Sequence, residues 1–597
     1  MPSLRSHAFW LGVLLACAAA IAYLPALRGG FVWDDDTTLT RNPLIQGTDG
    51  LRRIWFTTEP TDYWPVTYSA LWAEWRLWGS APFGYHAVNL CLHLGASLLL
   101  WRLLRRLWGS GWAAWLAAAL FALHPVNVES VAWITQQKSL LAMVFYLLTV
   151  GCFLRTGLAA PSAAPGGSLR AGWYGLSLAA FVVALLSKGS VATAPVVLMG
   201  LILWHRPLTW RDLAWTAPFF AVSAVMVMTN LWFRGHGSSE VIRNVGGLDR
   251  LLGAGGVVWF YLGKALWPVR LIFVYPRWQI RAGDPACWVG LAAAVGLTIF
   301  LWRMARLRCW GAVPAASGPA AKSWARPVLF AWGYFCVMLI PVMGFADVYF
   351  MKYSLVADHY QHLALIGVAA LAAAGWQGLS SRLAPATVRV LPIAVLTGLG
   401  ILTWRQCLIY RNVASLYLAT IARNPASTLA HNNMGGVLMG QNRFSEAETQ
   451  YEEVLQIDPG SEIAHFNLAE ALLREGRLQE AVAQYETAIR LKPDYLEARN
   501  DLGGALAHLG RWPEAIVQFE AALRLMPGNA RIHFNLANAL ADSGRFSAAV
   551  AEYREALRLK QDYAPAHRNL GRSLRQLGRS AEAEAEFNEA ARLGGSH

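Results

Sequence analysis

The sequence predicts an all-α protein in two chemically different parts, a polytopic helical membrane domain followed by an α-solenoid of short helical repeats. Of its 597 residues, 55% are hydrophobic and 15% are charged, whereas soluble domains have about 25% charged residues. The net charge of 51 − 37 = +14 is split unevenly, with 33 basic and 14 acidic residues in 1–423 and 18 basic and 23 acidic residues in 424–597. A 34-residue period runs through the second part. These values exclude a disordered chain and argue against a single soluble globule.

The first apolar run, residues 8–27, predicts a membrane-spanning helix, because about 20 residues cover ~30 Å of hydrocarbon. A cleaved signal peptide is the alternative, since small residues lie at 17–20, but the run is longer than a typical signal core. Further apolar runs lie at 87–105, 112–130, 139–156, 171–187, 190–205, 213–232, 251–268, 285–303, 327–346, 361–379 and 386–404.

Arginine placement predicts the orientation, because loops on the cytoplasmic side are enriched in basic residues. Arg102, Arg105 and Arg106 mark one inner loop, and Arg206 and Arg211 mark the next. With the N-terminus inside, the pattern is consistent only if one run does not cross, and we interpret 251–268 as re-entrant or interfacial. About eleven crossings remain, which places the repeats outside. The outer loops are then 28–86, 124–138, 187–190, 233–284 and 347–360.

The basic excess of the membrane part suits anionic lipid headgroups or a phosphorylated substrate. Nucleic acid is not an expected partner, because no basic stripe lies on a soluble domain. Lys138, Lys188 and Lys352 sit at the outer ends of helices, and Lys264 sits in the re-entrant run. A lysine in that position can bind a phosphate as a point charge, the alternative being snorkelling to the interface. The seven cysteines form no CxxC pair, so neither a zinc site nor a disulfide framework is expected.

The repeat part is predicted from residues that recur every 34 positions, in the tetratricopeptide pattern of two antiparallel helices per unit. Alanine recurs from Ala447 to Ala583, an aromatic residue follows each alanine by four positions, and glycine marks the turns. Tyr417 and Pro425 keep the phase. The expected domains are 1–408 for the membrane part, 409–427 for a half-repeat linker and, for the five repeats, 428–461, 462–495, 496–529, 530–563 and 564–597.

One asparagine position per repeat predicts a peptide-binding ladder, because stacked amides can donate to and accept from an extended backbone. The position is expected on the concave face, and the alternative is that asparagine is simply common there. A histidine also recurs in phase, for which we expect packing and not metal binding. The ladder residues are Asn433, Asn467, Asn535 and Asn569, with Asp501 interrupting.

Asp34, Asp35 and Asp36 form the strongest candidate catalytic motif, because adjacent carboxylates at a membrane surface repel unless they meet a metal, a cation or a substrate. Asp34 or Asp35 is predicted to act as the general base on a hydroxyl. A second aspartate orients the acceptor or binds a divalent metal such as Mg²⁺ or Mn²⁺. The alternative is a solvated loop with a helix cap at Asp36.

Two further outer segments carry candidate ligands for a donor. The segment from His124 through Glu129 to Lys138 ends one helix and begins another, with donor or metal binding and structural hydrogen bonding equally open. The tight turn at Lys188 places a lysine on the outer face, where it suits a phosphate.

Two other outer positions complete the candidate site. Asp358 and His359 lie at the mouth of a helix, where an acid can also be a mere cap. Arg270 and Arg277 flank aromatic residues, a mixture that suits a headgroup with a lipid tail but also any interfacial anchor.

Six motifs occur in order and carry a resemblance: FVWDDD followed by Asn42-Pro43, PFGYH at 82–86, HPVNVESVAWI at 124–134, LLSK at 185–188, YLGKALWP at 261–268 and VADHYQ at 356–361. Followed by tetratricopeptide repeats, they resemble the transmembrane and tetratricopeptide-repeat O-mannosyltransferase family, in its bacterial branch, over nearly the whole chain. The chain departs from the family pattern at 136–139, where only Lys138 matches, and at Gly189.

The resemblance implies a membrane domain of the GT-C glycosyltransferase fold and transfer of a sugar from a polyprenyl-phosphate donor to protein hydroxyls outside the cytoplasm. It also implies that Asp34 and Asp35 match the family's acidic pair and that His124, Glu129 and Lys188 match further motif positions. A bacterial inner membrane with the repeats on the outer side is the expected location.

Two functions from different classes remain as rivals to the transferase. A non-catalytic membrane scaffold would need the asparagine ladder and not the aspartate motif. A transporter is disfavoured, because few ionisable residues lie in the middle of the predicted helices.

Overall fold

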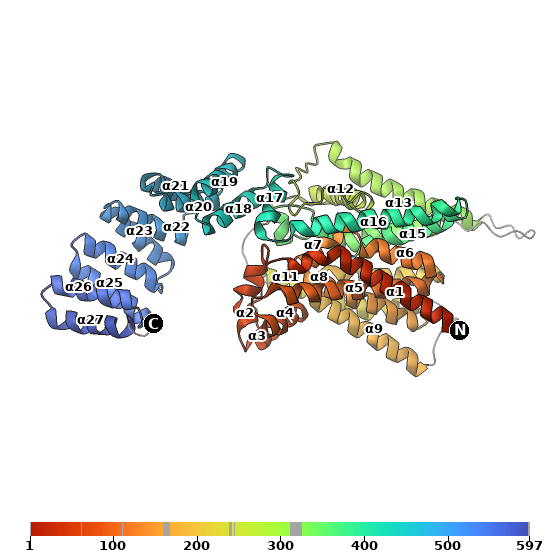
Figure 1. Cartoon of the computed structure of the whole chain (residues 1–597), viewed down its shortest axis with the longest axis horizontal. Coiled ribbons are helices and arrows are strands. Elements are labelled where there is room, and N and C mark those ends of the chain that lie inside the picture. Colours follow the sequence, from red (N-terminus) through yellow and green to blue (C-terminus); the bar gives the residue numbers. More distant parts are fainter. Residues whose placement is uncertain are drawn as a thin grey trace, which may run out of the picture. The chain divides into compact units, whose positions relative to one another are not determined.

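The computed structural model describes residues 2–60, 62–109, 111–158, 167–237, 242–243, 245–310 and 325–594. Within these ranges the chain is helical and contains no strand, so the predicted all-α class is confirmed. The chain divides into two compact units, Met1–Pro425 and Ala426–His597 (Figure 1).

The first unit consists of long apolar helices joined by short helices and turns. Helices α1, α5, α6 and α16 pack against one another, and α8 packs against α5 and α9. Its helices are α1 (Pro2–Tyr23), α2 (Pro43–Gln46), α3 (Gly50–Phe56), α4 (Pro65–Trp78), α5 (Pro82–Trp108), α6 (Gly111–Ala122), α7 (Val128–Ala132), α8 (Gln137–Arg155), α9 (Gly167–Ser187), α10 (Ala194–His205), α11 (Trp210–Gly237), α12 (Gly247–Leu266), α13 (Ala286–Trp310), α14 (Ala325–Leu339), α15 (Leu365–Ser380), α16 (Pro385–Ile409) and α17 (Val413–Ile421).

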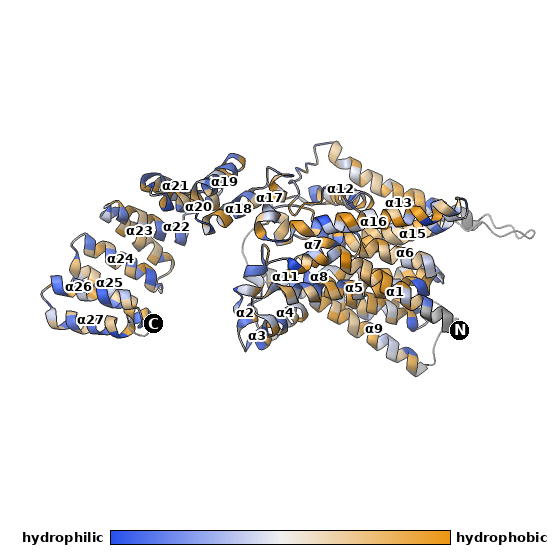
Figure 2. Ribbon diagram, in the orientation of Figure 1, coloured by the Kyte–Doolittle hydropathy of each residue, from blue (hydrophilic) through white to orange (hydrophobic). Residues whose placement is uncertain are grey.

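Eight helical segments among the described residues are long and apolar enough to cross a membrane, which makes this a membrane protein. Helices α6 and α7 with the turn before α7 form a ninth candidate, bent by 48°, and the segments Gly189–His205 and Leu365–Ser380 are shorter apolar helices. These eleven segments coincide with the eleven apolar runs predicted to cross. Helix α12, predicted to be re-entrant, is not among the candidate spans. Figure 2 shows the apolar colouring concentrated on the long helices of this unit.

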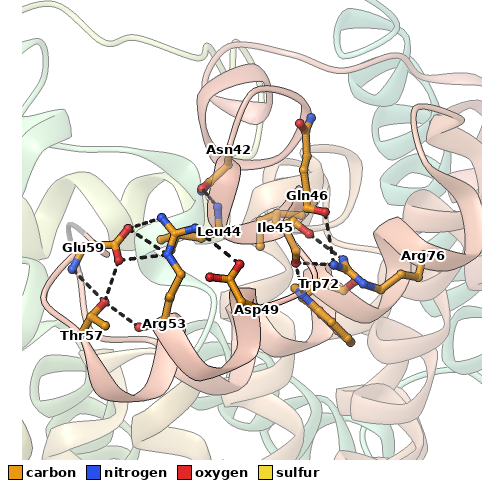
Figure 3. A network of polar contacts seen from close by, with 11 residues as sticks. Asn42, Leu44, Ile45, Gln46, Asp49, Arg53, Thr57, Glu59, Trp72 and Arg76 are labelled. Carbon is orange, nitrogen blue, oxygen red and sulfur yellow. Dashed lines mark hydrogen bonds and ion pairs between the residues drawn. The ribbon is translucent and has the colours of Figure 1, made fainter.

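Within residues 28–86, predicted from sequence as the first outer loop, the chain forms a small helical layer of α2, α3 and α4. Asn42 caps α2 by accepting from the backbone N–H of Leu44 (2.9 Å). The guanidinium of Arg76, on α4, donates to the carbonyl oxygens of Ile45 (2.6 Å), Gln46 and Gly47 (Figure 3). Because these carbonyls lie at the end of α2, a single arginine holds the loop onto α4.

Around this layer, Arg53 of α3 contacts the carboxylates of Glu59 and Asp49 (Figure 3). Below it lies a buried apolar cluster with Leu39, Ile45 and Ile54 at its centre. Burial of such side chains stabilises a fold by ~1.5–3 kcal/mol each. The loop is therefore a rigid platform, which matters because α4 contacts two segments of the candidate site.

The second unit contains ten helices in five antiparallel pairs, as the repeat period predicts. The aromatic residue of each second helix packs into its repeat, as Tyr485 and Tyr553 do at 0% and 1% exposure. Gly476 (φ +82°) and Gly544 (φ +81°) adopt the left-handed conformation that the turn between paired helices requires. The helices are α18 (Thr428–Gly440), α19 (Phe444–Ile457), α20 (Glu462–Arg474), α21 (Leu478–Leu491), α22 (Leu496–His508), α23 (Trp512–Leu525), α24 (Ala530–Asp542), α25 (Phe546–Leu559), α26 (Ala564–Gln576) and α27 (Ser580–Gly594).

The recurring histidines join the two helices of a repeat. His533 lies with Nδ1 2.6 Å from Glu552 Oε2 and Nε2 2.9 Å from the carbonyl oxygen of Pro527. Arg499 occupies the same position in the third repeat and donates to the carbonyl of Pro493 (2.8 Å). This position is therefore a hydrogen-bonding bridge inside each repeat.

Candidate functional site

The three carboxylates of the motif at 34–36 differ in burial and in hydrogen bonding. Asp35 is fully buried, and its two oxygens accept hydrogen bonds from the backbone N–H groups of Val32 (2.8 Å) and Thr135 (3.0 Å). Asp36 is exposed and bonds within its own helical turn. Asp35 thus acts as a structural anchor between the first outer loop and the segment before α8.

Asp34 has one carboxylate oxygen held by hydrogen bonds and one that could accept a proton. Its Oδ1 accepts from the indole N–H of Trp133 (2.9 Å) and from the hydroxyl of Thr135 (2.9 Å). No other residue in the described part of the chain donates a hydrogen bond to its Oδ2. The preceding Trp33 has φ +46°, a strained conformation for a bulky residue, and its ring packs on Trp133 at 5.2 Å. This strained turn fixes Asp34 against the segment 133–135.

Lys138 supplies a positive charge next to this base. Its ammonium lies 4.7 Å from the ring centre of Trp64 and 5.9 Å from that of Trp133, a cation–π arrangement. The charge of Lys138 also interacts with the carboxylate of Asp34. The first outer loop and the start of α8 therefore place a base and a cation on one side of Trp133.

Lys188, in the turn between α9 and α10, provides a second cation. Its Nζ donates to Ser139 Oγ (2.8 Å) and lies 3.4 Å from Gln136 Oε1, and Ser139 Oγ donates to the same Gln136 oxygen (2.8 Å). Lys188 is near enough to Lys138 for their charges to repel. Two like charges in one half-buried place indicate a site for an anion.

Helix α4 positions both lysine-bearing segments. Thr67 Oγ1 donates to the carbonyl of Ser187 (2.9 Å), directly before Lys188. Glu74 accepts from Gln137 Nε2 (2.5 Å), directly before Lys138. The platform of the first outer loop thus sets the spacing of the two cations.

Glu129 and Asp358 form a buried acidic centre beside the lysines. Glu129 Oε2 accepts from the backbone N–H of His359 (2.9 Å), and the His359 Nδ1 lies 3.2 Å from Glu129 Oε1. Asp358 accepts from the Tyr275 hydroxyl (2.9 Å). The His359 ring packs edge-on against Trp133, whose indole holds Asp34. One continuous network therefore links these residues to the base.

The environment shifts the ionisation of these groups in directions that suit acid–base work. Burial raises the pKa of Asp34, although Lys138 opposes this, and burial together with the neighbouring Asp34 raises the pKa of Asp35 well above its usual range. Burial, with repulsion from Lys138, lowers the pKa of Lys188 to about 7. Burial also holds the pKa of His359 well below its usual range, so its imidazole is neutral.

The aspartate motif does not fit the divalent metal that was considered from sequence. Asp35 spends both oxygens on backbone N–H groups, and Asp36 bonds to Thr40 (3.0 Å). Within the described ranges, no group of three or more His, Cys, Asp or Glu side chains is placed to hold a metal ion. A metal ion would find one free oxygen on Asp34 and one on the exposed Asp36, whereas hard cations prefer several oxygen ligands.

Arg270 lies in a separate groove of about 550 Å³. The groove is lined by aromatic residues, including Phe260 and Trp267, and by the cations Lys264 and Arg270. The charge of Lys264 interacts with Asp358, so the groove adjoins the acidic centre. Its mixture of indole rings and cations matches a lipid chain with a phosphate head.

The other predicted ligands have structural contacts. Arg277 donates to the backbone carbonyl of Lys352, and both lie in outer loops of this unit. His124 Nε2 lies 3.0 Å from the carbonyl oxygen of Ala265, which ties α12 to the turn before α7.

Three of the four predicted ladder asparagines donate to an asparagine of the preceding repeat that lies outside the predicted ladder. Asn467 Nδ2 donates to Asn432 Oδ1 (2.8 Å), and Asn535 Nδ2 donates to Asn500 Oδ1 (2.9 Å). Asn569 does the same with Asn538 (2.9 Å). Asn467, Asn535 and Asn569 therefore join the first helices of neighbouring repeats through amide bridges, a role that the sequence analysis did not consider.

Several residues of the site were missed by sequence reasoning. Trp133 and Thr135 hold Asp34, Gln136 holds Lys188, and Tyr275 holds Asp358. Their side chains are uncharged, and only the three-dimensional arrangement joins them to the acids. The Thr-Gln-Gln stretch before Lys138 was a usable signal, because polar residues at a helix start need partners.

The relatives of this chain include proteins named protein O-mannosyl-transferases. Tmtc1 of Drosophila melanogaster is 24% identical over 551 residues, which is 75% of this chain and 62% of that protein. Tmtc2 of Drosophila melanogaster is 36% identical over 158 residues, 24% of this chain and 16% of that protein, and TMTC4 of Homo sapiens is 30% identical over 173 residues, 25% of this chain and 23% of that protein. The chain thus spans less than two thirds of the length of these relatives.

Family models described as tetratricopeptide repeat match the second unit at 438–487, 466–530, 509–553 and 564–593, and one described as TPR repeat matches 537–578. The repeat identity predicted from the 34-residue period is confirmed. Among solved structures, the chain is similar to YrrB, a TPR protein with an unusual peptide-binding site, with a TM-score of 0.29 and 19% identity over 31% of this chain and 95% of that chain.

Proposed function

Because the chain is a homologue of proteins named protein O-mannosyl-transferases over three quarters of its length, we propose that it transfers mannose or another hexose to Ser and Thr hydroxyls of proteins. The proposed donor is a polyprenyl-phosphate sugar. The reaction would take place on the non-cytoplasmic side, in a bacterial inner membrane, with the repeats on the same side.

The observation that carries the proposal is the meeting of one available carboxylate with two cations. Asp34 comes from the first outer loop, Lys138 from the start of α8 and Lys188 from the turn after α9. Three separate segments are thus brought together by the contacts of Trp133, Thr135 and α4. An acid that can remove a proton beside lysines that can hold a phosphate is the arrangement that sugar transfer from a lipid phosphate needs.

Asp34 is the proposed general base. Its Oδ2 takes the proton of the acceptor hydroxyl while that oxygen forms a bond to the anomeric carbon. The bond between the anomeric carbon and the phosphate oxygen breaks, and the lipid phosphate leaves with the electron pair. A single displacement inverts the anomeric centre. The raised pKa of Asp34 makes it a stronger base, and its carboxylate must be ionised to act.

The protein would bind the donor through its phosphate and through its lipid chain. Lys188 and Lys138 neutralise the phosphate and stabilise the extra charge on it as the bond to sugar breaks. The groove with Lys264 and Arg270 is the proposed place for the lipid chain next to the phosphate. Arg277 and Lys352 would face the same headgroup region, and Glu129 and His359 would orient Lys188 and the sugar. The proposed reaction uses no divalent metal at Asp34, Asp35 and Asp36, because Asp35 spends both oxygens on backbone N–H groups.

The repeats would present the acceptor protein, because tetratricopeptide arrays bind extended segments along their first helices. A membrane and a protein are the expected partners, and nucleic acid is not. The scaffold function is the second candidate. It is favoured by the asparagine bridges, which give the array a role in rigidity that is independent of catalysis.

The test is mass spectrometry of intact envelope glycoproteins from the host. Wild type is compared with a deletion strain and with the deletion complemented by Asp34→Asn or by Asp36→Asn, an exposed neighbour in the same motif. A hexose-sized mass on Ser or Thr should disappear in the deletion, return with Asp36→Asn and stay absent with Asp34→Asn. Unchanged glycosylation in every strain would contradict the transferase and favour the scaffold.

A further inference from the structure

Polar and charged side chains link the first helices of the five repeats to one another. Hydrogen bonds join α18 to α20 and α22 to α24, through the pairs Asn432–Asn467 and Asn500–Asn535. Between α20 and α22 the carboxylates of Glu470 and Asp501 repel each other. A hydrogen bond from Asn569 to Asn538 joins α26 to α24. We call this surface the first-helix strip.

The strip is acidic in the second and third repeats. Glu470 is half-buried, and Glu497 and Asp501 follow on α22, four residues apart and therefore on one face. Burial raises the pKa of Glu470 and Asp501, and their mutual repulsion adds to the shift of Glu470. Arg474 is the basic residue close enough to Glu470 to oppose this. Acids held close together favour a positively charged partner.

The strip is basic in the fourth and fifth repeats. Arg568, Arg572 and Arg575 lie at i, i+4 and i+7 of α26 and share one face, and all three are exposed. Arg531 on α24 stands at the boundary, where its charge reaches Asp501. One acidic residue, Asp542 on α24, lies in the same region. Its charge and the charge of Arg572 both influence the hydroxyl of Tyr553. Basic charge nevertheless prevails at this end.

Several arginines in the turns and second helices of the array are neutralised by a neighbouring glutamate, and the four arginines on the first helices α24 and α26 are not. In the described part of the repeats, none of the four strip arginines Arg531, Arg568, Arg572 and Arg575 forms an ion pair with a carboxylate. Outside the strip, six arginines pair with a glutamate three residues away at 2.5–2.7 Å: Arg443, Arg477, Arg511, Arg558, Arg579 and Arg592. The basic charge of α24 and α26 is therefore not cancelled by an ion pair with a described residue, and it is available to a partner.

We propose that the first-helix strip binds an extended polypeptide segment of opposite polarity, with basic residues against the second and third repeats and acidic residues against the fourth and fifth. First helices packed ~10 Å apart give three successive repeats a length of ~30 Å, which an extended segment of about nine residues covers at ~3.4 Å per residue. The acidic block disfavours a uniform polyanion, because Glu470, Glu497 and Asp501 would repel it. The inference deepens the proposed function by giving the acceptor a charge pattern, but binding can be measured without any sugar transfer.

The test uses the full-length protein in detergent micelles and fluorescent peptides of 14 residues, read by fluorescence anisotropy. Four peptides share one composition of Lys, Glu, Ser and Ala. One has the lysines in its first half and the glutamates in its second, one has the reverse order, one alternates the charges, and one is a scrambled control. An all-glutamate peptide is the polyanion probe. Each is measured at low and at high salt.

One of the two block peptides should bind at least fivefold more tightly than the alternating peptide, and high salt should weaken it. The double variant Arg568→Glu/Arg572→Glu should abolish this preference, whereas Arg524→Glu, an exposed arginine on the second helix α23, should leave it intact. Equal binding of all peptides, no binding of either block peptide, or stronger binding of the all-glutamate peptide would overturn the proposal. Loss of sugar transfer with block binding retained would contradict only the proposed function.

Discussion

Replacement of Asp34 by asparagine is expected to lower the rate of transfer, whereas replacement of Asp35 is expected to lower the stability of the fold. In Asp34→Asn the remaining carbonyl oxygen still accepts from Trp133 and Thr135, so the fold should be kept. The general base is lost, which costs about 10²–10⁴-fold in rate. In Asp35→Asn one amide nitrogen is placed against the backbone N–H of Val32 or Thr135. One buried N–H then lacks an acceptor, which destabilises by ~1–3 kcal/mol.

The assay combines initial rates of sugar transfer with thermal unfolding in one detergent. Asp34→Asn should show the larger loss of rate with a melting temperature near that of wild type. Asp35→Asn should melt at a lower temperature and, well below that temperature, lose less activity than Asp34→Asn. Asp36→Asn, on an exposed carboxylate, is the matched control and should change neither quantity.

The reverse ranking would refute the reasoning. If Asp35→Asn were fully stable and inactive while Asp34→Asn kept its rate, the base would be Asp35, and the hydrogen bonds of Asp35 would have been assigned a structural role wrongly.

Three other outcomes follow from the same contacts. The kcat/KM for transfer should rise with pH as Asp34 ionises above its raised pKa and fall again as Lys188 loses its proton near pH 7. The pH profile of Lys188→Arg should lack the falling limb. An unchanged falling limb in this variant would show that the limb does not report the ionisation of Lys188. A chelator should leave initial rates unchanged, because Asp35 spends both oxygens on backbone N–H groups and no group of three or more His, Cys, Asp or Glu among the described residues is placed to hold a metal; a loss restored by Mg²⁺ or Mn²⁺ would speak against this. Asn467→Ala should destabilise the array by ~0.5–1.5 kcal/mol through the lost amide bridge, seen as faster hydrogen exchange in the first two repeats, with the exposed Gln456→Ala as control.

The fold class was predictable because it depends on patterns that are periodic in sequence. Eleven apolar runs appear as eleven apolar helical segments, and the 34-residue period appears as five helix pairs. The uncertain run at 251–268 became α12, which is not a candidate span. The helical layer of the first outer loop was not predicted, since α2 to α4 are short and their stability comes from contacts such as those of Arg76.

The candidate site was predictable only in its charged residues. Asp34, Lys138 and Lys188 stand out because charge is rare in this part of the chain. Their grouping depends on Trp133 and Thr135, whose roles require the folded chain. The sequence could not distinguish Asp34 from Asp35 as the base. Asp35 is an anchor because it is buried and accepts from two backbone N–H groups, and these contacts are visible only in the folded chain.

The most direct test of the central claim is a reconstituted transfer reaction. Purified protein in lipid nanodiscs is given a peptide with Ser and Thr and, in separate reactions, a polyprenyl-phosphate hexose or a nucleotide hexose, and the peptide is read by mass spectrometry. The account predicts a hexose-sized mass on the peptide from the lipid donor with wild type and with Asp36→Asn, and none with Asp34→Asn. Transfer that persists in Asp34→Asn, transfer only from the nucleotide sugar, or no transfer by the wild-type protein would contradict it.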